Sequence, residues 1–108
     1  LEEIKELEKI SEGDDKITGG NGNDVINAGD GNDDVSSENG EDEVNGGDGN
    51  DKLDGGSGND LIHGNSGNDG INGKAGNDTL FGDEDTDSIN GHSGTDTCDG
   101  EVEVNREL

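Results

Sequence analysis

Aspartate recurs at every ninth position of this chain through ten consecutive units, without an insertion or a deletion. The residues are Asp15, Asp24, Asp33, Asp42, Asp51, Asp60, Asp69, Asp78, Asp87 and Asp96. A fixed short period indicates that one small backbone unit is stacked on copies of itself, so each copy places its carboxylate at an equivalent position. Neighbouring carboxylates repel one another unless a positive charge lies between them. The chemistry that this spacing predicts is therefore the binding of cations.

The rest of the sequence cannot build an ordinary hydrophobic core. Of the 108 residues, 20% are hydrophobic, 1% are aromatic and 22 are glycine, and the formal net charge is -24. Such a chain buries too little apolar surface to offset the entropy that is lost on ordering. Small domains obtain the missing free energy from disulfides or from metal ions, and the single Cys98 excludes an internal disulfide. Composition therefore also favours bound metal.

Charge and hydropathy exclude several classes of partner. A surface this acidic repels the phosphates of nucleic acids and of anionic membranes, and no apolar run is long enough for a transmembrane helix. Leu1–Ile10 lacks the basic and apolar regions of a signal peptide. We expect a monomer with no nucleic-acid partner and no membrane insertion.

Each nine-residue unit combines a turn with a short strand. We number its places so that the recurring aspartate stands at place six, as in Gly46–Asp54 (GGDGNDKLD). Places one to six are rich in Gly and Asn, which accept positive φ and indicate a tight turn. Place eight is apolar between mostly polar neighbours, which is the period of a strand with one buried face. The place-eight residues are Ile17, Ile26, Val35, Val44, Leu53, Ile62, Ile71, Leu80, Ile89 and Cys98.

One apolar side chain per unit cannot be buried within that unit, so two consecutive units must pack their strands face to face as one coil of 18 residues. When coils stack, the turns of alternate units line up along two edges. The first edge carries Asp15, Asp33, Asp51, Asp69 and Asp87, and the second edge carries Asp24, Asp42, Asp60, Asp78 and Asp96.

Calcium is the cation that suits these two edges best. Stacked strands lie about 4.8 Å apart, and two ionised carboxylates at that spacing repel by several kcal/mol. A divalent cation between them converts this repulsion into attraction. Hard oxygen ligands on flexible turns favour Ca²⁺ over Zn²⁺, Cu²⁺ and Mg²⁺.

The repeated unit GGxGxDxUx, in which U is apolar, resembles the RTX (haemolysin-type) calcium-binding nonapeptide repeat over roughly residues 10–99. The resemblance implies an all-β fold, a right-handed parallel β-roll (β-solenoid) that is disordered without Ca²⁺ and folds on binding it. It also implies an extracellular, secreted protein and a structural or secretion-type role. We expect a cap at residues 1–12, a β-roll at 10–99 and a capping strand or tail at 100–108.

The resemblance further implies which backbone carbonyls join the aspartates. Each ion would lie between two turns that are one coil apart. The earlier turn gives the carbonyls of places two and four and its aspartate, and the later turn gives those of places one and three and its aspartate. One such site uses Gly47, Gly49 and Asp51 with Gly64, Ser66 and Asp69, and another uses Gly56, Gly58 and Asp60 with Gly73, Ala75 and Asp78. Further carbonyl candidates are Gly20, Gly22, Gly29, Gly31, Gly46 and Gly55.

The number of turns limits the number of ions, and some turns depart from the glycine pattern. Five turns on each edge leave four gaps per edge, so about eight ions is the ceiling. The departing residues are Ile10, Ser11, Ser37, Glu38 and Asp85. Positive φ costs a non-glycine residue about 1 kcal/mol. We therefore expect weaker or empty sites at Asp15, Asp42 and Asp87, and the strongest sites between Asp51 and Asp69 and between Asp60 and Asp78.

The two ends of the chain differ from the repeats. Leu1–Ile10 has apolar residues at positions 1, 4, 7 and 10 and Glu–Lys pairs three residues apart, which predict a short helix that caps the first coil. This contrast also suggests a hybrid or engineered chain. Val102 and Val104 alternate with polar residues and predict a final strand.

The sequence also bears on two other functions, catalysis and the binding of a surface. Equivalent carboxylates without a cleft or a nucleophile argue against catalysis, so we expect no enzyme activity. The alternative function keeps the solenoid but uses a flat face to bind ice or a partner. Place five supports it with a ladder of Asn23, Asn32, Asn50, Asn59, Asn68, Asn77, Thr86 and Thr95, which Asp14 and Glu41 interrupt.

Overall fold

The computed structural model describes residues 4–8, 13–99 and 102–104, with side chains described from residue 13 to residue 98. Every regular element in this part of the chain is a β-strand. The strands are β1 (Ile4–Glu8), β2 (Lys16–Thr18), β3 (Asn23–Asn27), β4 (Asp34–Ser36), β5 (Glu43–Asn45), β6 (Lys52–Asp54), β7 (Leu61–His63), β8 (Gly70–Asn72), β9 (Thr79–Phe81), β10 (Ser88–Asn90), β11 (Thr97–Asp99) and β12 (Val102–Val104). Within the described ranges, no helix meets the length and apolarity needed to cross a membrane.

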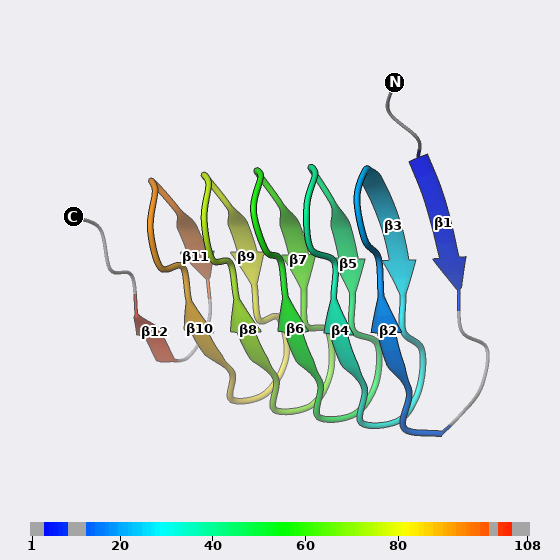
Figure 1. Cartoon of the computed structure of the whole chain (residues 1–108). Coiled ribbons are helices and arrows are strands. Elements are labelled where there is room, and N and C mark those ends of the chain that lie inside the picture. The colour runs from blue at the N-terminus through cyan, green and yellow to red at the C-terminus, as the bar shows by residue number, and fades with distance from the viewer. Residues whose placement is uncertain (1–3, 9–12, 100–101, 105–108) are drawn as a thin grey trace.

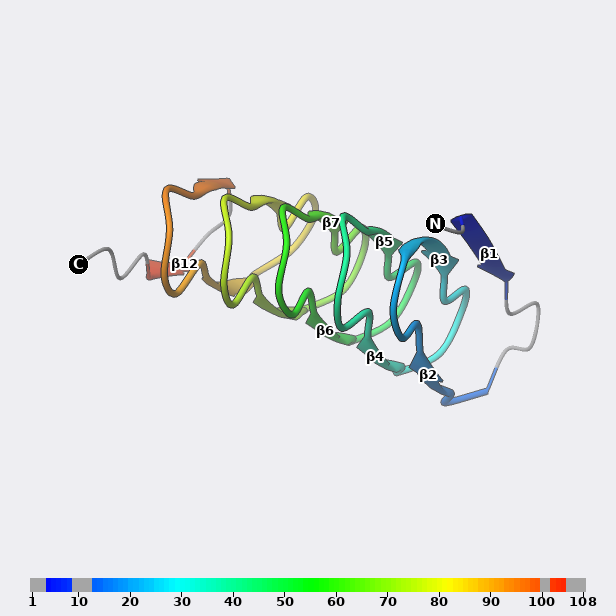
Figure 2. The same ribbon diagram turned by 45° about the horizontal axis from the view of Figure 1, so that its top comes forward.

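Consecutive strands alternate between two parallel sheets (Figure 1). One sheet has the order β1-β3-β5-β7-β9-β11 and the other has the order β12-β10-β8-β6-β4-β2. Paired residues in the repeats are 18 positions apart, as in Val44↔Ile62 and Leu53↔Ile71. The coils follow one another along a single axis (Figure 2). The predicted β-solenoid with 18 residues per coil is therefore confirmed.

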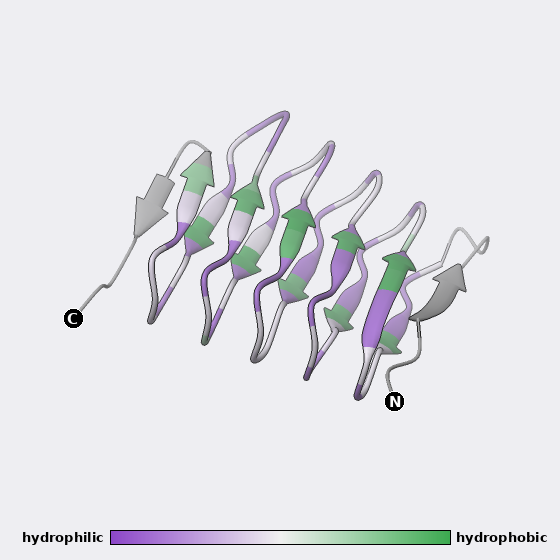
Figure 3. Cartoon of the chain, turned by 90° about the horizontal axis from the view of Figure 1, so that it is seen from above, coloured by the Kyte–Doolittle hydropathy of each residue, from purple (hydrophilic) through white to green (hydrophobic). Residues whose placement is uncertain are grey.

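The place-eight side chains form the core between the two sheets. Those from Ile26 to Ile89 are at most 1% exposed, and Cys98 packs against the end of the row. From β2 to β10, each three-residue strand buries only its central side chain, so in β6 Leu53 is buried between exposed Lys52 and half-buried Asp54. Apolar residues consequently recur at the same point of successive strands (Figure 3). The narrow core explains why so few apolar residues suffice to define the fold.

The predicted N-terminal helix is wrong for residues 4–8. These residues form β1, which pairs in parallel with β3 from Ile4↔Asn23 to Glu8↔Asn27. A helix of about ten residues gains few hydrogen bonds after a costly nucleation step. The edge of β3 instead supplies backbone partners for all five residues of β1. The remaining residues of the predicted cap, 1–3 and 9–12, lie outside the described residues.

The other sheet is extended at the opposite end of the solenoid. There β12 pairs in parallel with β10 through Ser88↔Val102, Ile89↔Glu103 and Asn90↔Val104. Each sheet therefore carries one strand from outside the nonapeptide units, β1 in one and β12 in the other.

Candidate metal sites

The turns of successive units share one backbone shape. Places two and four have positive φ, as at Gly47 (86°) and Gly49 (112°). The same conformation occurs at the non-glycine residues Glu38, Asn65, Lys74, Asp83, Asp85 and His92. Glu38 (71°) and Asp85 (74°) thus keep the turn shape at a cost of about 1 kcal/mol each. Departures from glycine at these two places add strain but do not reshape the turn.

Most place-six aspartates are buried, and from Asp33 to Asp96 one carboxylate oxygen of each joins two coils. All of them from Asp24 to Asp87 are 1–3% exposed. The backbone N–H of Asp51 donates to Oδ1 of Asp69 at 2.7 Å, and that of Asp60 donates to Oδ1 of Asp78 at 2.9 Å. Sequence reasoning missed these bonds, because the repeat period gives the spacing of the carboxylates but not their orientation.

The second oxygen of these carboxylates has no such role. Oδ2 is buried without a hydrogen-bond partner in Asp15, Asp24, Asp33, Asp51, Asp60, Asp69 and Asp78. A buried carboxylate oxygen that is left unpaired is costly. A cation beside Oδ2 would remove this cost.

Oδ2 and a carbonyl of the next coil converge beside the glycine at place one. A Cβ added to Gly46 would lie 2.7 Å from Oδ2 of Asp51 and 2.9 Å from the carbonyl oxygen of Gly64. At Gly55, the corresponding atoms are Oδ2 of Asp60 at 2.6 Å and the carbonyl oxygen of Gly73 at 3.0 Å. The missing side chain of the glycine therefore leaves room between two oxygens. We call the space between two turns one coil apart an inter-turn gap.

Other predicted carbonyls also face these gaps. The carbonyl oxygen of Gly49 is the nearest atom to a Cβ added at Gly67 one coil later, and that of Gly58 is nearest to a Cβ added at Gly76. Place-four carbonyls of the earlier turn therefore point toward the later turn. The carbonyl oxygen of Gly29 points in the same way toward Gly47, so place two follows the same rule.

These oxygens fit the requirements of Ca²⁺, which takes six to eight oxygen ligands at about 2.3–2.6 Å in a flexible geometry. In the part of the chain that the structure describes, no three His, Cys, Asp or Glu side chains gather into a metal-binding group. A cation in a gap would therefore depend on backbone carbonyls as much as on carboxylates.

Burial raises the pKa of the place-six carboxyls of Asp33, Asp42, Asp51, Asp60, Asp69 and Asp78. It is the largest cause of pKa values of about 8 for Asp51 and Asp60 and about 7 for Asp69 and Asp78. Hydrogen bonds from backbone N–H groups lower these pKa values, and carboxylates one coil away raise them. Burial also raises the pKa of Asp42 to about 6. In the folded roll without a cation, protons would therefore bind these carboxyls near neutral pH.

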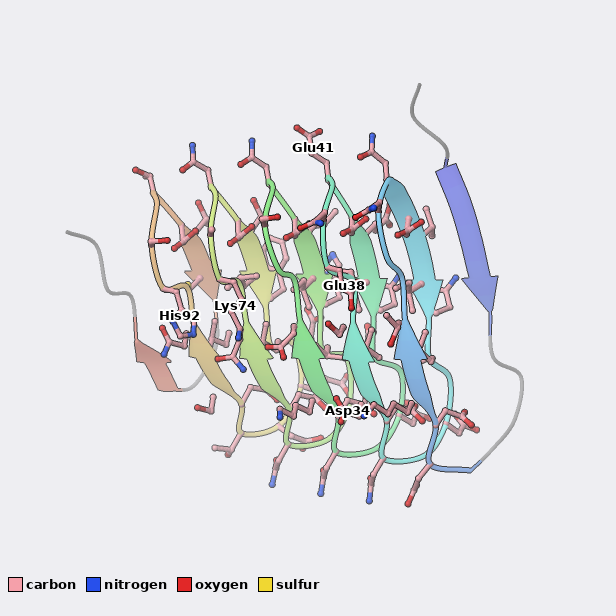
Figure 4. The ribbon with its side chains drawn as sticks, in the orientation of Figure 1. Asp34, Glu38, Glu41, Lys74 and His92 are labelled. Atoms are coloured by element: carbon pink, nitrogen blue, oxygen red, sulfur yellow. The ribbon has the colours of Figure 1, made fainter. Side chains whose placement is uncertain are left out.

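The asparagines at place five form a second hydrogen-bonded ladder at the tips of the turns. The N–H of Asn68 donates to Oδ1 of Asn50 at 2.8 Å, and the N–H of Asn77 donates to Oδ1 of Asn59 at 2.8 Å. Glu41 stands in the row of tips along the second edge (Figure 4). Since Oδ1 of these asparagines already binds the next coil, this oxygen has a structural role.

The repeated turn and strand match a known family of repeats. A family model described as the RTX calcium-binding nonapeptide repeat (4 copies) matches residues 11–44, 36–71 and 63–98. The three matches overlap and together include all ten place-six aspartates. No curated protein and no solved structure gave a significant match.

Proposed function

Because the chain belongs to the family of RTX calcium-binding nonapeptide repeats, we propose that it is a non-enzymatic module that folds as it binds Ca²⁺ in its inter-turn gaps. One observation carries this proposal. Oδ2 of a buried aspartate, without a hydrogen-bond partner, and a carbonyl oxygen of the next coil converge on one point beside a glycine, as at Asp51, Gly64 and Gly46.

Six residues would hold each ion. In one gap the ligands are the carboxylates of Asp51 and Asp69 and the carbonyls of Gly47, Gly49, Gly64 and Ser66. In a second gap they are the carboxylates of Asp60 and Asp78 and the carbonyls of Gly56, Gly58, Gly73 and Ala75. Bound Ca²⁺ supplies positive charge to a chain whose formal net charge is -24.

Folding on binding follows from the energetics of the free chain. Repulsion between the place-six carboxylates and the burial of unpaired Oδ2 atoms oppose the stacking of the coils. The apolar core offsets little of this cost, because each strand contributes only one side chain to it. Each turn serves two gaps, so binding in one gap orders the turn that the next gap needs. The transition should therefore be cooperative.

We place this module outside the cell, in a structural or secretion-type role. Its repeat family is consistent with secretion. Ca²⁺-binding modules of extracellular proteins work at about 10⁻⁴–10⁻³ M Ca²⁺, and that range is the one in which we expect the chain to fold.

Far-ultraviolet circular dichroism of the chain in EDTA and then in excess Ca²⁺ tests the proposal, with Mg²⁺ at the same concentration as the control. A disordered spectrum in EDTA, a β-rich spectrum in Ca²⁺ and little change in Mg²⁺ are expected. A chain that is already β-structured in EDTA, or that Ca²⁺ leaves unchanged, would refute it.

A further inference from the structure

Two neighbouring units carry a side chain at place one, where the units after them carry glycine. The two residues are Ala28 and Ser37, and both are fully buried. Their backbones are placed as at the glycines: Ser37 N–H donates to the Asp54 carbonyl at 3.0 Å, as Gly46 N–H donates to the His63 carbonyl at 2.9 Å. Place one is not among the positive-φ positions. Glycine at place one therefore provides room and not a special backbone conformation.

The side chain of Ser37 uses this room. A Cβ at the equivalent glycine Gly46 would point between an aspartate Oδ2 and the place-one carbonyl of the next coil. Ser37 carries its side chain from the same backbone position, and its Oγ donates to the Gly55 carbonyl at 2.8 Å. That carbonyl is a proposed ligand in the gap between Asp42 and Asp60. The hydroxyl thus takes up an oxygen that a cation would need.

A second observation distinguishes the same two gaps. In the gap of Ala28, Gly31 N–H donates to the Asp48 carbonyl at 3.1 Å. In the gap of Ser37, Gly40 N–H donates to the Ser57 carbonyl at 3.2 Å. Both bonds join place four of the earlier turn to place three of the later turn. Among the described residues, Gly49 and Gly58, whose gaps have glycine at place one, donate no such bond. The two turns are therefore bonded directly to each other where place one carries a side chain.

We propose that Ala28 and Ser37 fill with their own side chains the space that a cation takes beside the place-one glycines. The gap between Asp33 and Asp51 and the gap between Asp42 and Asp60 then bind no Ca²⁺. The gaps beside Gly19, Gly46, Gly55, Gly64 and Gly73 remain open. This inference rests on the proposed function and divides the solenoid into Ca²⁺-binding coils and a self-sealed segment near its N-terminal end.

Counting the bound Ca²⁺ at saturation by equilibrium dialysis tests this inference. Ser37→Gly opens its gap and should raise the number by about one, and Ala28→Gly should do the same at the other gap. Ser88→Gly is the matched control, because Ser88 is exposed at place seven of β10, outside the gaps, where the neighbouring strand β8 already has Gly70. This control should leave the number unchanged.

The converse substitution closes an open gap. Gly55→Ser should lower the number of bound ions by about one, because its Cβ would lie 2.6 Å from Oδ2 of Asp60. Gly70→Ser is its control, since a Cβ at Gly70 meets nothing within 4 Å. Crystals grown in Ca²⁺ give an independent reading, with no ion beside Ser37 in the wild type and one ion there in Ser37→Gly.

The two proposals fail in different ways. A wild-type chain that binds no Ca²⁺ at all would refute the proposed function itself. A wild-type chain that binds Ca²⁺ but holds an ion beside Ser37, or whose ion number does not rise in Ser37→Gly, would overturn only the present inference.

Discussion

Each place-six aspartate has two different tasks for its two oxygens. Oδ1 of Asp60 accepts the backbone N–H of Asp42 at 2.9 Å and so fixes the preceding coil. Oδ2 of the same residue faces the gap toward the next coil, near the Gly73 carbonyl. In Asp60, Oδ1 therefore belongs to the backbone ladder, whereas Oδ2 is the oxygen that is left for a cation.

Asp60→Asn separates these two tasks. The amide oxygen can still accept the N–H of Asp42, but an NH₂ group replaces the oxygen that faces the gap. We expect the loss of at least one bound ion and a Ca²⁺ midpoint that is raised about tenfold or more, or about 1.4 kcal/mol. The measurement is a Ca²⁺ titration followed by circular dichroism. Asp34→Asn removes the same charge from an exposed place-seven position and should change the midpoint little. Equal effects of the two variants would contradict the assignment.

The raised pKa values predict how Ca²⁺ binding depends on pH. Folded-state pKa values of about 8 at Asp51 and Asp60 lie above the unfolded value near 3.9. In a metal-free roll, protonation is therefore stabilising: this contribution is complete below the unfolded pKa and is lost as the pH rises through the folded pKa. The disordered metal-free chain has carboxyls that are already ionised above about pH 5, so Ca²⁺ binding that is coupled to folding should release few protons near neutral pH.

Isothermal titration calorimetry in two buffers of different ionisation enthalpy measures the proton release directly. Few protons should be released at about pH 7 or at about pH 9, because the carboxyls of the unfolded chain are ionised at both pH values. Proton release at about pH 7 that disappears at about pH 9 would show that Ca²⁺ binds a roll that is already folded and protonated, and it would contradict folding on binding.

At the scale of the elements, the three-residue strands depend on a single inward side chain. Ile62 of β7 is 0% exposed, while its neighbour Leu61 is only half-buried on the outer face. Ile62→Ala should lower the free energy of unfolding of the Ca²⁺-loaded protein by about 2–5 kcal/mol. Leu61→Ala is the matched control on the same strand and should cost clearly less. Urea unfolding in excess Ca²⁺ gives both free energies of unfolding. Similar losses of free energy in the two variants would contradict a core that takes only one side chain from each strand.

Elements defined by the repeat could be predicted, and elements defined by contacts outside it could not. The apolar place eight and its polar neighbours were enough to predict the strands and the 18-residue coil, because both follow from local periodicity. β1 was missed because the apolar residues of its segment also fit a helical spacing, and its pairing with β3 is a long-range contact.

The role of place one was missed for a different physical reason. The sequence shows that Ser37 replaces a glycine, and the expected consequence was the cost of positive φ. Only the structure separates the places that need positive φ, such as place two at Glu38, from place one, where the side chain competes for space. A motif records that glycine is preferred, but it does not say which property of glycine is used.

At the scale of the whole molecule, the fold propagates from coil to coil. Within the described residues, each repeat strand pairs only with the strands before and after it in its sheet. The ladders of Asp and Asn bonds likewise connect positions 18 residues apart. The free energy of unfolding of such a solenoid is approximately the sum of the stabilities of its coils and of the interfaces between neighbouring coils. The solenoid is therefore compact only if the free energy of closing each inter-turn gap between its acidic turns is favourable.

Small-angle X-ray scattering measures this dependence on the intact chain. An unfolded chain of this length has a radius of gyration of about 33 Å, whereas the Cα radius of gyration of the folded structure is 12.4 Å. The chain should be near the larger value in EDTA and should contract toward the smaller value as Ca²⁺ is added, in one cooperative step. Mg²⁺ at the same concentration should cause little contraction, because its octahedral geometry and tightly held water suit these carbonyl-rich turns poorly. A radius already near 13 Å in EDTA would mean that the core and the backbone ladders outweigh carboxylate repulsion without any cation, and the proposed coupling of folding to Ca²⁺ would then fail.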